Sequence, residues 1–283
     1  MNKVIIGTVQ FGIDYGITNK TGKIEEKDLE KIFEFCDENK LYLFDTAQDN
    51  GESENILSKY VKIYPNFKII TKFKFKKDID LEVNKSIEKF EKIHYFLLHS
   101  FNDYKDDLIN KLLMYKQIDK IGVSIYNVEE AKILLKDMRI KVIQLPFNYI
   151  DNQWDDIDFF ELLEKRKDIE IHVRSIFLQG ILLNPIIRNP LNIPKKDFDF
   201  LNEKIELICN KFNLTKLELC FAYINSIKWI NKFLIGIDNL DHLILNFKII
   251  NNNIILNENQ LNFIKEEMKD VNKIICNPSL WKF

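Results

Sequence analysis

The first third of the chain places an aspartate, a lysine and a histidine each directly after a short apolar run. Asp45 follows LYLF, Lys72 follows KIIT and His99 follows YFLL, at equal intervals. Each interval fits one strand–helix–strand unit. Because parallel strands of a barrel bring their carboxyl ends to the same side, we expect these side chains to form one ionisable cluster. Such a cluster can transfer protons, so it indicates a catalytic or ligand-binding site.

The elements that would position this cluster alternate along the chain. Short runs rich in Ile, Val, Leu, Phe and Tyr have the composition of buried parallel strands: Lys3–Gly7, Tyr42–Asp45, Lys68–Thr71, Tyr95–Leu98, Lys120–Val123, Val142–Leu145, Glu170–Val173 and Lys232–Ile235. Amphipathic patterns typical of helices lie between and after them: Glu25–Asn39, Glu54–Lys62, Leu81–Lys92, Lys105–Tyr115, Val128–Lys136, Ile157–Lys167, Asp197–Phe212, Thr215–Ser226, Leu240–Ile250 and Glu258–Asp270. This alternation predicts a single (β/α)8 barrel domain over residues 1–283. The alternative is a doubly wound sheet, but no Gly-x-Gly-x-x-Gly follows the first strand.

Composition narrows the range of functions. The chain has 283 residues, of which 46% are hydrophobic and 30% charged, as in ordinary globular proteins. Its net charge of −2 gives no electrostatic reason to expect nucleic acid or an anionic membrane as a partner. No uninterrupted apolar stretch is long enough to cross a membrane. The four cysteines are scattered without metal-binding spacing, which predicts reduced thiols, a cytoplasmic protein and no metal site.

One connection, Phe177–Lys196, is too long for an ordinary link between a strand and the next helix, and it carries Pro185, Pro190 and Pro194. Long loops without secondary structure are commonly functional. We therefore expect a lid or a wall of the substrate site, with a plain connector as the alternative.

Short motifs follow one another in a fixed order through almost the whole chain. They are Gly7-Thr8, Phe44-Asp45-Thr46-Ala47, Gly51-x-x-Glu54, Thr71-Lys72, Leu98-His99-Ser100, Ile121-Gly122-Val123-Ser124, Gln144, and Ile235-Gly236 with His242-Leu243 and Asn246. The ordered set resembles the aldo-keto reductase superfamily. GTVQFGIDYGITN and RSIFLQGILL look closest to bacterial members associated with surface-sugar and small-metabolite pathways. The resemblance implies an oxidoreductase that uses NADP or NAD on a carbonyl or sugar-type small molecule.

The resemblance also implies roles for the ionisable cluster. In that family an Asp, a Tyr, a Lys and a His act together, and the Tyr donates a proton to a carbonyl that receives hydride from the cofactor. Asp45, Lys72 and His99 match three of these residues, but the Tyr position falls on Asn50 in DTAQDNG. An amide can hydrogen-bond to a substrate oxygen but does not release a proton near neutral pH. Loss of a general acid costs about 10²–10⁴-fold in rate.

The positions implied for the cofactor depart from the family in part. The candidate cofactor-binding residues are Gly7, Thr8, Ser124, Gln144, Arg174, Gly236, His242 and Asn246. The family's Ser-Asn pair is Ser124-Ile125 here, and Arg174 stands where an aromatic residue stacks on the nicotinamide. No basic residue after Gly236 is evident for a 2′-phosphate, and Asp238 would repel one. We expect weak nucleotide binding, with no advantage of NADP(H) over NAD(H).

Three functions are compatible with these residues. The first is a reductase or dehydrogenase in which another group supplies the proton. His99, with an unperturbed pKa of about 6.5, is the best substitute, and Tyr15 and Asp49 are weaker ones. The second is non-redox acid–base chemistry on a sugar-like substrate, such as epimerisation or elimination, with Lys72 or His99 transferring the proton. The third is a non-catalytic small-molecule-binding barrel. Arg174 favours a polar or anionic ligand, since Arg matches carboxylate and phosphate. The sequence does not determine the oligomeric state.

Overall fold

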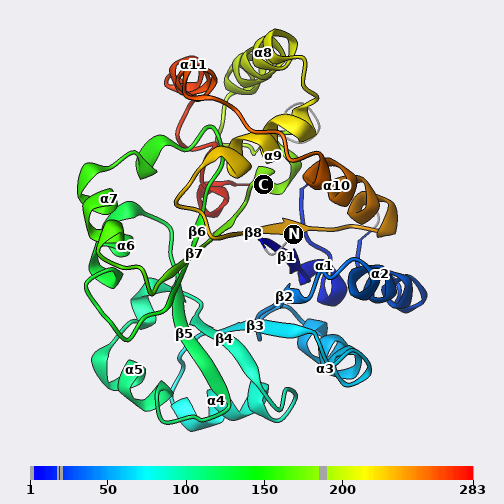
Figure 1. The fold of residues 1–283 in the computed structure, drawn as a ribbon, viewed down its shortest axis with the longest axis vertical. Coiled ribbons are helices and arrows are strands. Elements are labelled where there is room, and N and C mark those ends of the chain that lie inside the picture. Colours follow the sequence, from blue (N-terminus) through cyan, green and yellow to red (C-terminus); the bar gives the residue numbers. More distant parts are fainter. Residues whose placement is uncertain (1–2, 18, 20–21, 185–189, 283) are drawn as a thin grey trace.

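The computed structural model describes residues 3–17, 19, 22–184 and 190–282, and these residues form a closed barrel of eight parallel strands (Figure 1). The strands are β1 (Val4–Gly7), β2 (Leu43–Asp45), β3 (Lys68–Phe73), β4 (Ile93–Leu98), β5 (Ile118–Ser124), β6 (Val142–Pro146), β7 (Glu170–Arg174) and β8 (Lys232–Gly236). Each strand pairs with its neighbours in chain order, and β8 closes the ring on β1. The predicted (β/α)8 barrel is therefore confirmed.

Helices surround the ring of strands (Figure 1). They are α1 (Val9–Gly12), α2 (Glu26–Glu38), α3 (Ser53–Ile63), α4 (Ile79–Ile87), α5 (Asp106–Leu112), α6 (Val128–Leu134), α7 (Ile157–Glu164), α8 (Lys195–Phe212), α9 (Lys216–Ser226), α10 (Leu240–Asn252) and α11 (Glu258–Met268). Short 3-10 turns lie at Phe101–Asp103, Asn152–Trp154, Leu178–Gly180 and Pro278–Leu280. No helix in the described part of the chain is both long and apolar enough to cross a membrane.

The ends of the elements differ slightly from the predicted ranges. β3 continues through Phe73, so Lys72 lies inside the strand rather than after it. Helix α4 begins before the predicted Leu81, because the Asp78 carboxylate caps it by accepting hydrogen bonds from two main-chain N–H groups of its first turn. The short helix α1 was not predicted, since its four residues are too few to show a helical period.

Alternation along the strands divides their side chains between two separate hydrophobic clusters. The inner cluster fills the barrel with Ile5, Leu43, Ile70, Tyr95, Leu97 and Val142, and Leu234 packs against it. The outer cluster, which includes Phe44 and Phe96, joins the strands to the helices. Asp45 and Lys72 alternate in step with the inner cluster, so their side chains point into the barrel at its carboxyl end.

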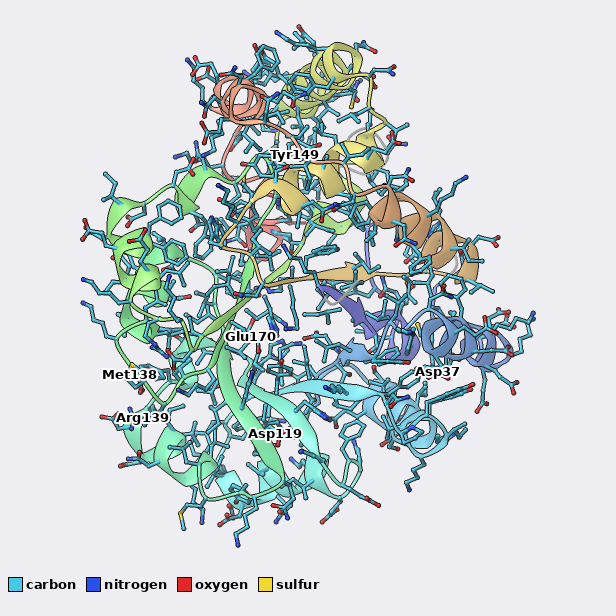
Figure 2. The ribbon with its side chains drawn as sticks, in the orientation of Figure 1. Asp37, Asp119, Met138, Arg139, Tyr149 and Glu170 are labelled. Carbon is cyan, nitrogen blue, oxygen red and sulfur yellow. The ribbon has the colours of Figure 1, made fainter. Side chains whose placement is uncertain are left out.

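A polar cluster occupies the opposite, amino-terminal end of the barrel interior. Glu170 lies inside the ring of strands (Figure 2) and accepts hydrogen bonds from Tyr95 and His172. It also forms ion pairs with Lys120 and Lys232. Although burial alone would raise it, hydrogen bonds from His172 and the two lysines lower the pKa of Glu170. An ionic network thus fills the amino-terminal end of the barrel interior, opposite the end that carries Asp45 and Lys72.

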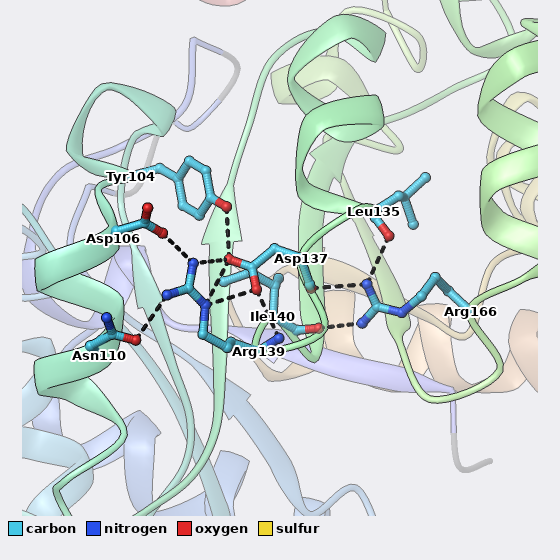
Figure 3. A network of polar contacts seen from close by, with 8 residues as sticks. All are labelled: Tyr104, Asp106, Asn110, Leu135, Asp137, Arg139, Ile140 and Arg166. Atoms are coloured by element: carbon cyan, nitrogen blue, oxygen red, sulfur yellow. Dashed lines mark hydrogen bonds and ion pairs between the residues drawn. The ribbon is translucent and has the colours of Figure 1, made fainter.

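Two arginines, Arg139 and Arg166, connect neighbouring segments of the outer layer between α5 and α7. Arg166 is almost fully buried and donates to main-chain oxygens in the connection between α6 and β6 (Figure 3): those of Leu135, Asp137 and Ile140. Arg139 forms an ion pair with Asp137 and donates to the Asn110 side chain of α5. These contacts fix the α6–β6 connection by multiple charge-assisted hydrogen bonds.

Glu54, from the Gly51-x-x-Glu54 motif, is a buried junction between α3, β3 and α4. Its side chain is 1% exposed, and its carboxylate accepts from the hydroxyls of Thr71 and Ser86 at 2.7 and 2.8 Å. Lys89 lies 2.9 Å from the other carboxylate oxygen. Because Thr71 precedes Lys72 in β3, this junction also holds the strand that carries the candidate catalytic lysine.

Removing the Glu54 carboxylate should destabilise the barrel strongly. Glu54→Ala leaves two buried hydroxyls and a partly buried lysine without their partner, so we expect a loss of about 3–5 kcal/mol in unfolding free energy. Glu54→Gln keeps an acceptor and should lose less. Urea unfolding measures both, and Glu91→Ala at an exposed glutamate provides the baseline. A Glu54→Ala protein as stable as this control would contradict the role assigned to Glu54.

The long connection after β7 is buried at its start and is hydrogen-bonded to the C-terminal segment near its end. Leu178, Ile181 and Leu182 are buried at its start. At its end, Leu191 N–H donates to the main-chain oxygen of Lys282 at 2.6 Å. Residues 185–189, which include Pro185, lie outside the described residues. The expectation that Phe177–Lys196 forms a lid or a wall of the substrate site stays a prediction.

Candidate active site

The carboxyl ends of all eight strands each contribute one predicted site residue to the mouth of the barrel. These residues stand at or just beyond the last inward-facing position of β1 to β8 in turn: Gly7, Asp45, Lys72, His99, Ser124, Gln144, Arg174 and Gly236. The strands are in register there, with Gly7 opposite both Asp45 and Gly236. The remaining predicted residues, Thr8, Asn50, His242 and Asn246, follow β1, β2 and β8.

Asp45 and Lys72 form a buried ion pair at the centre of this mouth, with 8% and 7% of their side chains exposed. The second carboxylate oxygen of Asp45 accepts a hydrogen bond of 2.7 Å from the Gln144 amide. Since β2 and β6 lie on opposite sides of the eight-stranded ring, this bond crosses the barrel interior. Burial lowers the pKa of Lys72, and the neighbouring Asp45 opposes that shift. The proton of Lys72 is therefore easier to release than that of a solvated lysine.

Thr8 holds β1 against β2 and α3 rather than facing the mouth. Its side chain is fully buried, and its hydroxyl donates to the main-chain oxygen of Asp45 at 2.9 Å. The Ser53 hydroxyl lies 2.7 Å from that of Thr8 and donates to the Thr8 main-chain oxygen. Thr46 donates in turn to the Ser53 hydroxyl. Ser53 thus links the carboxyl end of β1 to that of β2, next to Asp45.

Asn50 lies in a tight turn whose backbone is fixed by contact with α1. A Cβ atom added to Gly12 would stand 1.8 Å from the Asn50 main-chain oxygen, so only glycine permits this approach. Gly51 has a φ of 56°, which also favours glycine. The turn runs beside β3, where Gln48 N–H donates to the Lys72 main-chain oxygen at 2.9 Å. The partly exposed Asn50 side chain forms no hydrogen bond with any residue that the structure describes.

His99 is held at the mouth as a neutral imidazole. Its main-chain N–H donates to the Phe73 oxygen at 2.8 Å, which fixes the end of β4 against β3. Its buried Nδ1 has no hydrogen-bond partner among the described residues, and an Asp49 carboxylate oxygen lies 3.8 Å away. Burial, together with the charges of Lys72 and Lys74, lowers the pKa of His99 to about 4. At neutral pH the ring can therefore donate or accept one hydrogen bond, but it carries no readily released proton.

The depressed pKa of His99 can be measured directly. In a histidine ring NMR titration, the His99 signals should shift near pH 4, because burial and two lysines disfavour the imidazolium. His242, whose pKa is raised by a hydrogen bond to Asp238, should titrate above its usual value in the same spectra and serves as the internal control. His99→Asn assigns the signal. A His99 midpoint at or above that of an exposed histidine would contradict this electrostatic account.

The two weaker substitutes for the missing acid differ in their surroundings. A hydrogen bond from Lys74, 2.7 Å away, lowers the pKa of Asp49, so this carboxyl is ionised at neutral pH and holds no proton to donate. Tyr15 accepts a hydrogen bond of 3.3 Å from the Gln179 amide. Burial raises the pKa of Tyr15, and the charge of Arg174 opposes this shift. Tyr15 keeps its proton and lies at the outer rim, near Arg174.

The segment after β8 is organised by an aspartate rather than by a basic residue. The Asp238 carboxylate accepts a hydrogen bond from the Gln10 amide at 3.2 Å and lies 3.4 Å from His242 Nδ1. Asn239 caps α10 by accepting from the main-chain N–H of His242. Asn246 is buried one turn further along α10. Gly236 has little space above it, since a Cβ there would lie 3.3 Å from the Gln10 amide nitrogen.

Arg174 extends from the end of β7 over the ring of Tyr126, with its guanidinium carbon 4.6 Å from the ring centre. It donates one hydrogen bond, to the Ile125 main-chain oxygen at 3.2 Å. No ion pair of Arg174 is present in the described ranges. The segment expected to hold the nicotinamide therefore presents a planar cation at the same end of the barrel as the Asp45–Lys72 pair.

Sequence reasoning missed three residues that shape this mouth: Gln10, Ser53 and Tyr126. Gln10 is buried, and its side-chain oxygen has no hydrogen-bond partner among the described residues. It follows β1 closely, and its position after Gly7-Thr8 was the one available signal. Nothing in the local sequence marks Ser53 or Tyr126, because their partners come from distant segments.

Other features of the structure do not compete with this mouth. A cavity of about 340 Å³ lies near the amino-terminal ends of β1 and β8, between them and α9–α10. It is lined by Lys3, Val4, Asn225, Phe233, Ile250, Asn251 and Asn253, which offer no acid–base pair. Within the described ranges, no group of three or more His, Cys, Asp or Glu residues could hold a metal ion.

The barrel and the site at its mouth define a class of protein, and comparison with known proteins agrees. The sequence profile of the aldo/keto reductase family matches residues 3–267, so the chain belongs to this family. Among solved structures, MGS-M4, an aldo-keto reductase enzyme from a Medee basin deep-sea metagenome library, aligns with a TM-score of 0.66 at 15% identity, over 96% of this chain and 92% of that one. PA4992 of Pseudomonas aeruginosa, described as an aldo-keto reductase, aligns with a TM-score of 0.63 at 15% identity, over 89% and 90%. Identities this low show the fold alone. A search of curated proteins finds no match.

Proposed function

We propose that this protein is an NAD(P)(H)-dependent oxidoreductase with an atypical active site, acting on a carbonyl or sugar-type small molecule. The observation that carries the proposal is the buried Asp45–Lys72 ion pair, braced by Gln144 and placed beside a neutral His99. A pseudoenzyme has little reason to bear the desolvation cost of such a pair.

The mouth offers polar atoms that fit a nicotinamide nucleotide. The side-chain oxygens of Gln144 and Gln10 are buried and lack partners among the described residues, so both can accept hydrogen bonds from a ligand. Ser124 is buried next to Gln144, and Gly236, His242 and Asn246 would face the phosphates and ribose. The nucleotide would supply hydride.

The chain's own residues would bind the carbonyl and supply the proton. His99 would donate an N–H hydrogen bond to the substrate oxygen, since its ring is neutral at pH 7. The same depressed pKa argues against His99 as the acid that replaces tyrosine. Lys72 is the better donor, because burial lowers its pKa and Asp45 is adjacent to it. Asn50, on its rigid turn, would hydrogen-bond the substrate without transferring a proton.

Asn50→Tyr tests the proposed chemistry. The change should place a phenol near Lys72, and the adjacent cation should lower the phenol pKa. Reduction of a simple activated aldehyde should rise at least about tenfold, and up to about 10⁴-fold, because a general acid is restored. Steady-state assays with bound nucleotide measure the change. Asn50→Phe fills the same space without a hydroxyl and is the matched control.

Asn50→Tyr activity equal to that of Asn50→Phe, with nucleotide binding confirmed, would favour the alternative. That alternative is non-redox acid–base chemistry in a reductase-derived pocket, such as epimerisation or elimination, and Asn50 and Ile125 at two family positions support it. Failure to bind either nucleotide would favour it too, or a non-catalytic binding barrel. Thermal-shift measurements with sugars and carbonyl compounds would separate these last two.

Asp238 should set the nucleotide preference. Wild-type protein should bind NADPH no more tightly than NADH, because the family resemblance implies that a 2′-phosphate would bind near the segment after Gly236, where the Asp238 carboxylate would repel it. Asp238→Asn keeps the shape, removes the repulsion and frees His242, so NADPH affinity should increase about tenfold or more while NADH affinity changes little. Fluorescence titration measures both, with Asp241→Asn in the first turn of α10 as control. A large NADPH preference in the wild type would overturn this assignment.

We also propose a cytosolic location. All four cysteines are buried and unpaired in the structure, as expected of a protein kept in a reducing compartment.

A further inference from the structure

We propose that Arg174 is the binding site for an anionic group of the substrate, a carboxylate or a phosphate, and hence that the substrate is an acid. The identity of the reacting carbonyl rests on the function proposed above, whereas the anion site stands on the geometry of Arg174 itself. The residue occupies the last inward-facing position of β7, at the same end of the barrel as Asp45 and Lys72.

Arg174 is oriented before any ligand arrives. The guanidinium lies over the Tyr126 ring at 4.6 Å, and one N–H donates to the Ile125 oxygen at 3.2 Å. Stacking on the ring and one fixed hydrogen bond restrict the plane of the guanidinium. A guanidinium has five N–H donors. The others have no partner among the residues that the structure describes, so an edge suited to two parallel hydrogen bonds is available.

Arg174 also differs from the other cations of the mouth in its charge balance. Lys72 is neutralised by Asp45, and Lys74 lies 2.7 Å from a carboxylate oxygen of Asp49. Arg174 has no such partner within the described ranges. His99 is neutral at pH 7 because its pKa is about 4. Of Lys72, Lys74 and Arg174, only Arg174 lacks a carboxylate partner within the described ranges, and a bound anion would supply one.

The backbone that follows Arg174 is strained, as expected of a segment whose conformation is fixed for a purpose. Ser175, Leu178 and Gln179 have φ values of 61°, 50° and 53°. The other non-glycine residues with positive φ in the described ranges, Lys40, Asn213 and Asn253, lie at or just beyond helix ends, where such values are ordinary. Gln179 donates to the Tyr15 hydroxyl, so this loop also places Tyr15 near the guanidinium.

An anion at Arg174 would lie close enough to the reacting groups to affect them. The Arg174 charge contributes to the lowered pKa of Lys72, which places the two cations within electrostatic range. A substrate anion bound at Arg174 would offset this charge and raise the pKa of Lys72, so that Lys72 holds its proton while the substrate is bound. The substrate would then be held by its charged end and present its carbonyl to Lys72 and His99.

The first experiment tests the anion site without any reaction. Binding of inorganic phosphate and of acetate to the nucleotide-free protein is measured by calorimetry at constant ionic strength. Arg174→Gln should weaken anion binding about ten- to a hundredfold. Arg174→Lys keeps the charge but loses the planar guanidinium, so its anion affinity should lie between those of the wild type and Arg174→Gln. Lys74→Gln removes the same charge from the same mouth and is the control. Equal losses in Arg174→Gln and Lys74→Gln, or no binding by the wild type, would overturn the proposal.

The second experiment places the anion on the substrate. With nucleotide, the wild type should reduce 4-oxobutanoate with a kcat/KM at least tenfold above that for butanal, which has the same chain length and no carboxylate. Arg174→Gln should abolish this preference and Lys74→Gln should keep it. If Arg174→Gln keeps the preference for 4-oxobutanoate over butanal, the assignment of the anion to the substrate is overturned. It is also overturned if NADH abolishes phosphate binding, since Arg174 would then hold the nucleotide. No reduction of either aldehyde, with phosphate binding intact, would count against the proposed oxidoreductase and leave the anion site standing.

Discussion

The ion pair between Asp45 and Lys72 is the interaction around which the mouth of this barrel is built. Two charges with less than a tenth of their side-chain surface exposed must recover a large desolvation cost. Each oxygen of the Asp45 carboxylate accepts a hydrogen bond that offsets this cost, one from Lys72 and the other from Gln144. The Gln144 bond spans the ring from β6 to β2, so the pair and the closure of the barrel depend on each other.

The same requirement accounts for the polar residues immediately outside the strands. Asp45 and Lys72 stay paired only if the carboxyl ends of β2 and β3 keep fixed positions along the barrel axis. Thr8 and Ser53 fix the end of β2, and Glu54 fixes Thr71 next to Lys72. At the opposite end of the interior, Glu170 and its lysines form a second ionic layer, separated from the first by the apolar inner cluster. Apolar side chains between the two layers keep water away from the pair and strengthen its electrostatics.

Most of this architecture could be predicted from the sequence, because strand alternation is a local signal. Short apolar runs located all eight strands, and the ionisable residue after three of them, Asp45, Lys72 or His99, pointed to the mouth. What the sequence could not supply depends on distant contacts. The bond from Gln144 to Asp45 joins opposite strands. That the Gln10 side-chain oxygen has no hydrogen-bond partner among the described residues can be recognised only in the structure, where β1 and β8 are adjacent. The loss of acidity at His99 likewise arises from burial and from Lys72 and Lys74, whereas its unperturbed pKa had made it the preferred proton donor.

The departures that the family resemblance implies at positions 50 and 174 are physically connected in the proposed mechanism. In the proposed reaction, which has no tyrosine at position 50, Lys72 and His99 would stabilise the charge that develops on the substrate oxygen, and the proton would come from the buried Lys72. A lysine with a lowered pKa is a useful acid only while it remains protonated, and the uncompensated charge of Arg174 works against that state. An anionic substrate removes the conflict, since binding at Arg174 cancels the repulsion at the moment when the proton is needed. Under the proposed mechanism, Asn50 and Arg174 therefore favour the same class of ligand, a small acid whose charge would raise the pKa of Lys72 when it binds.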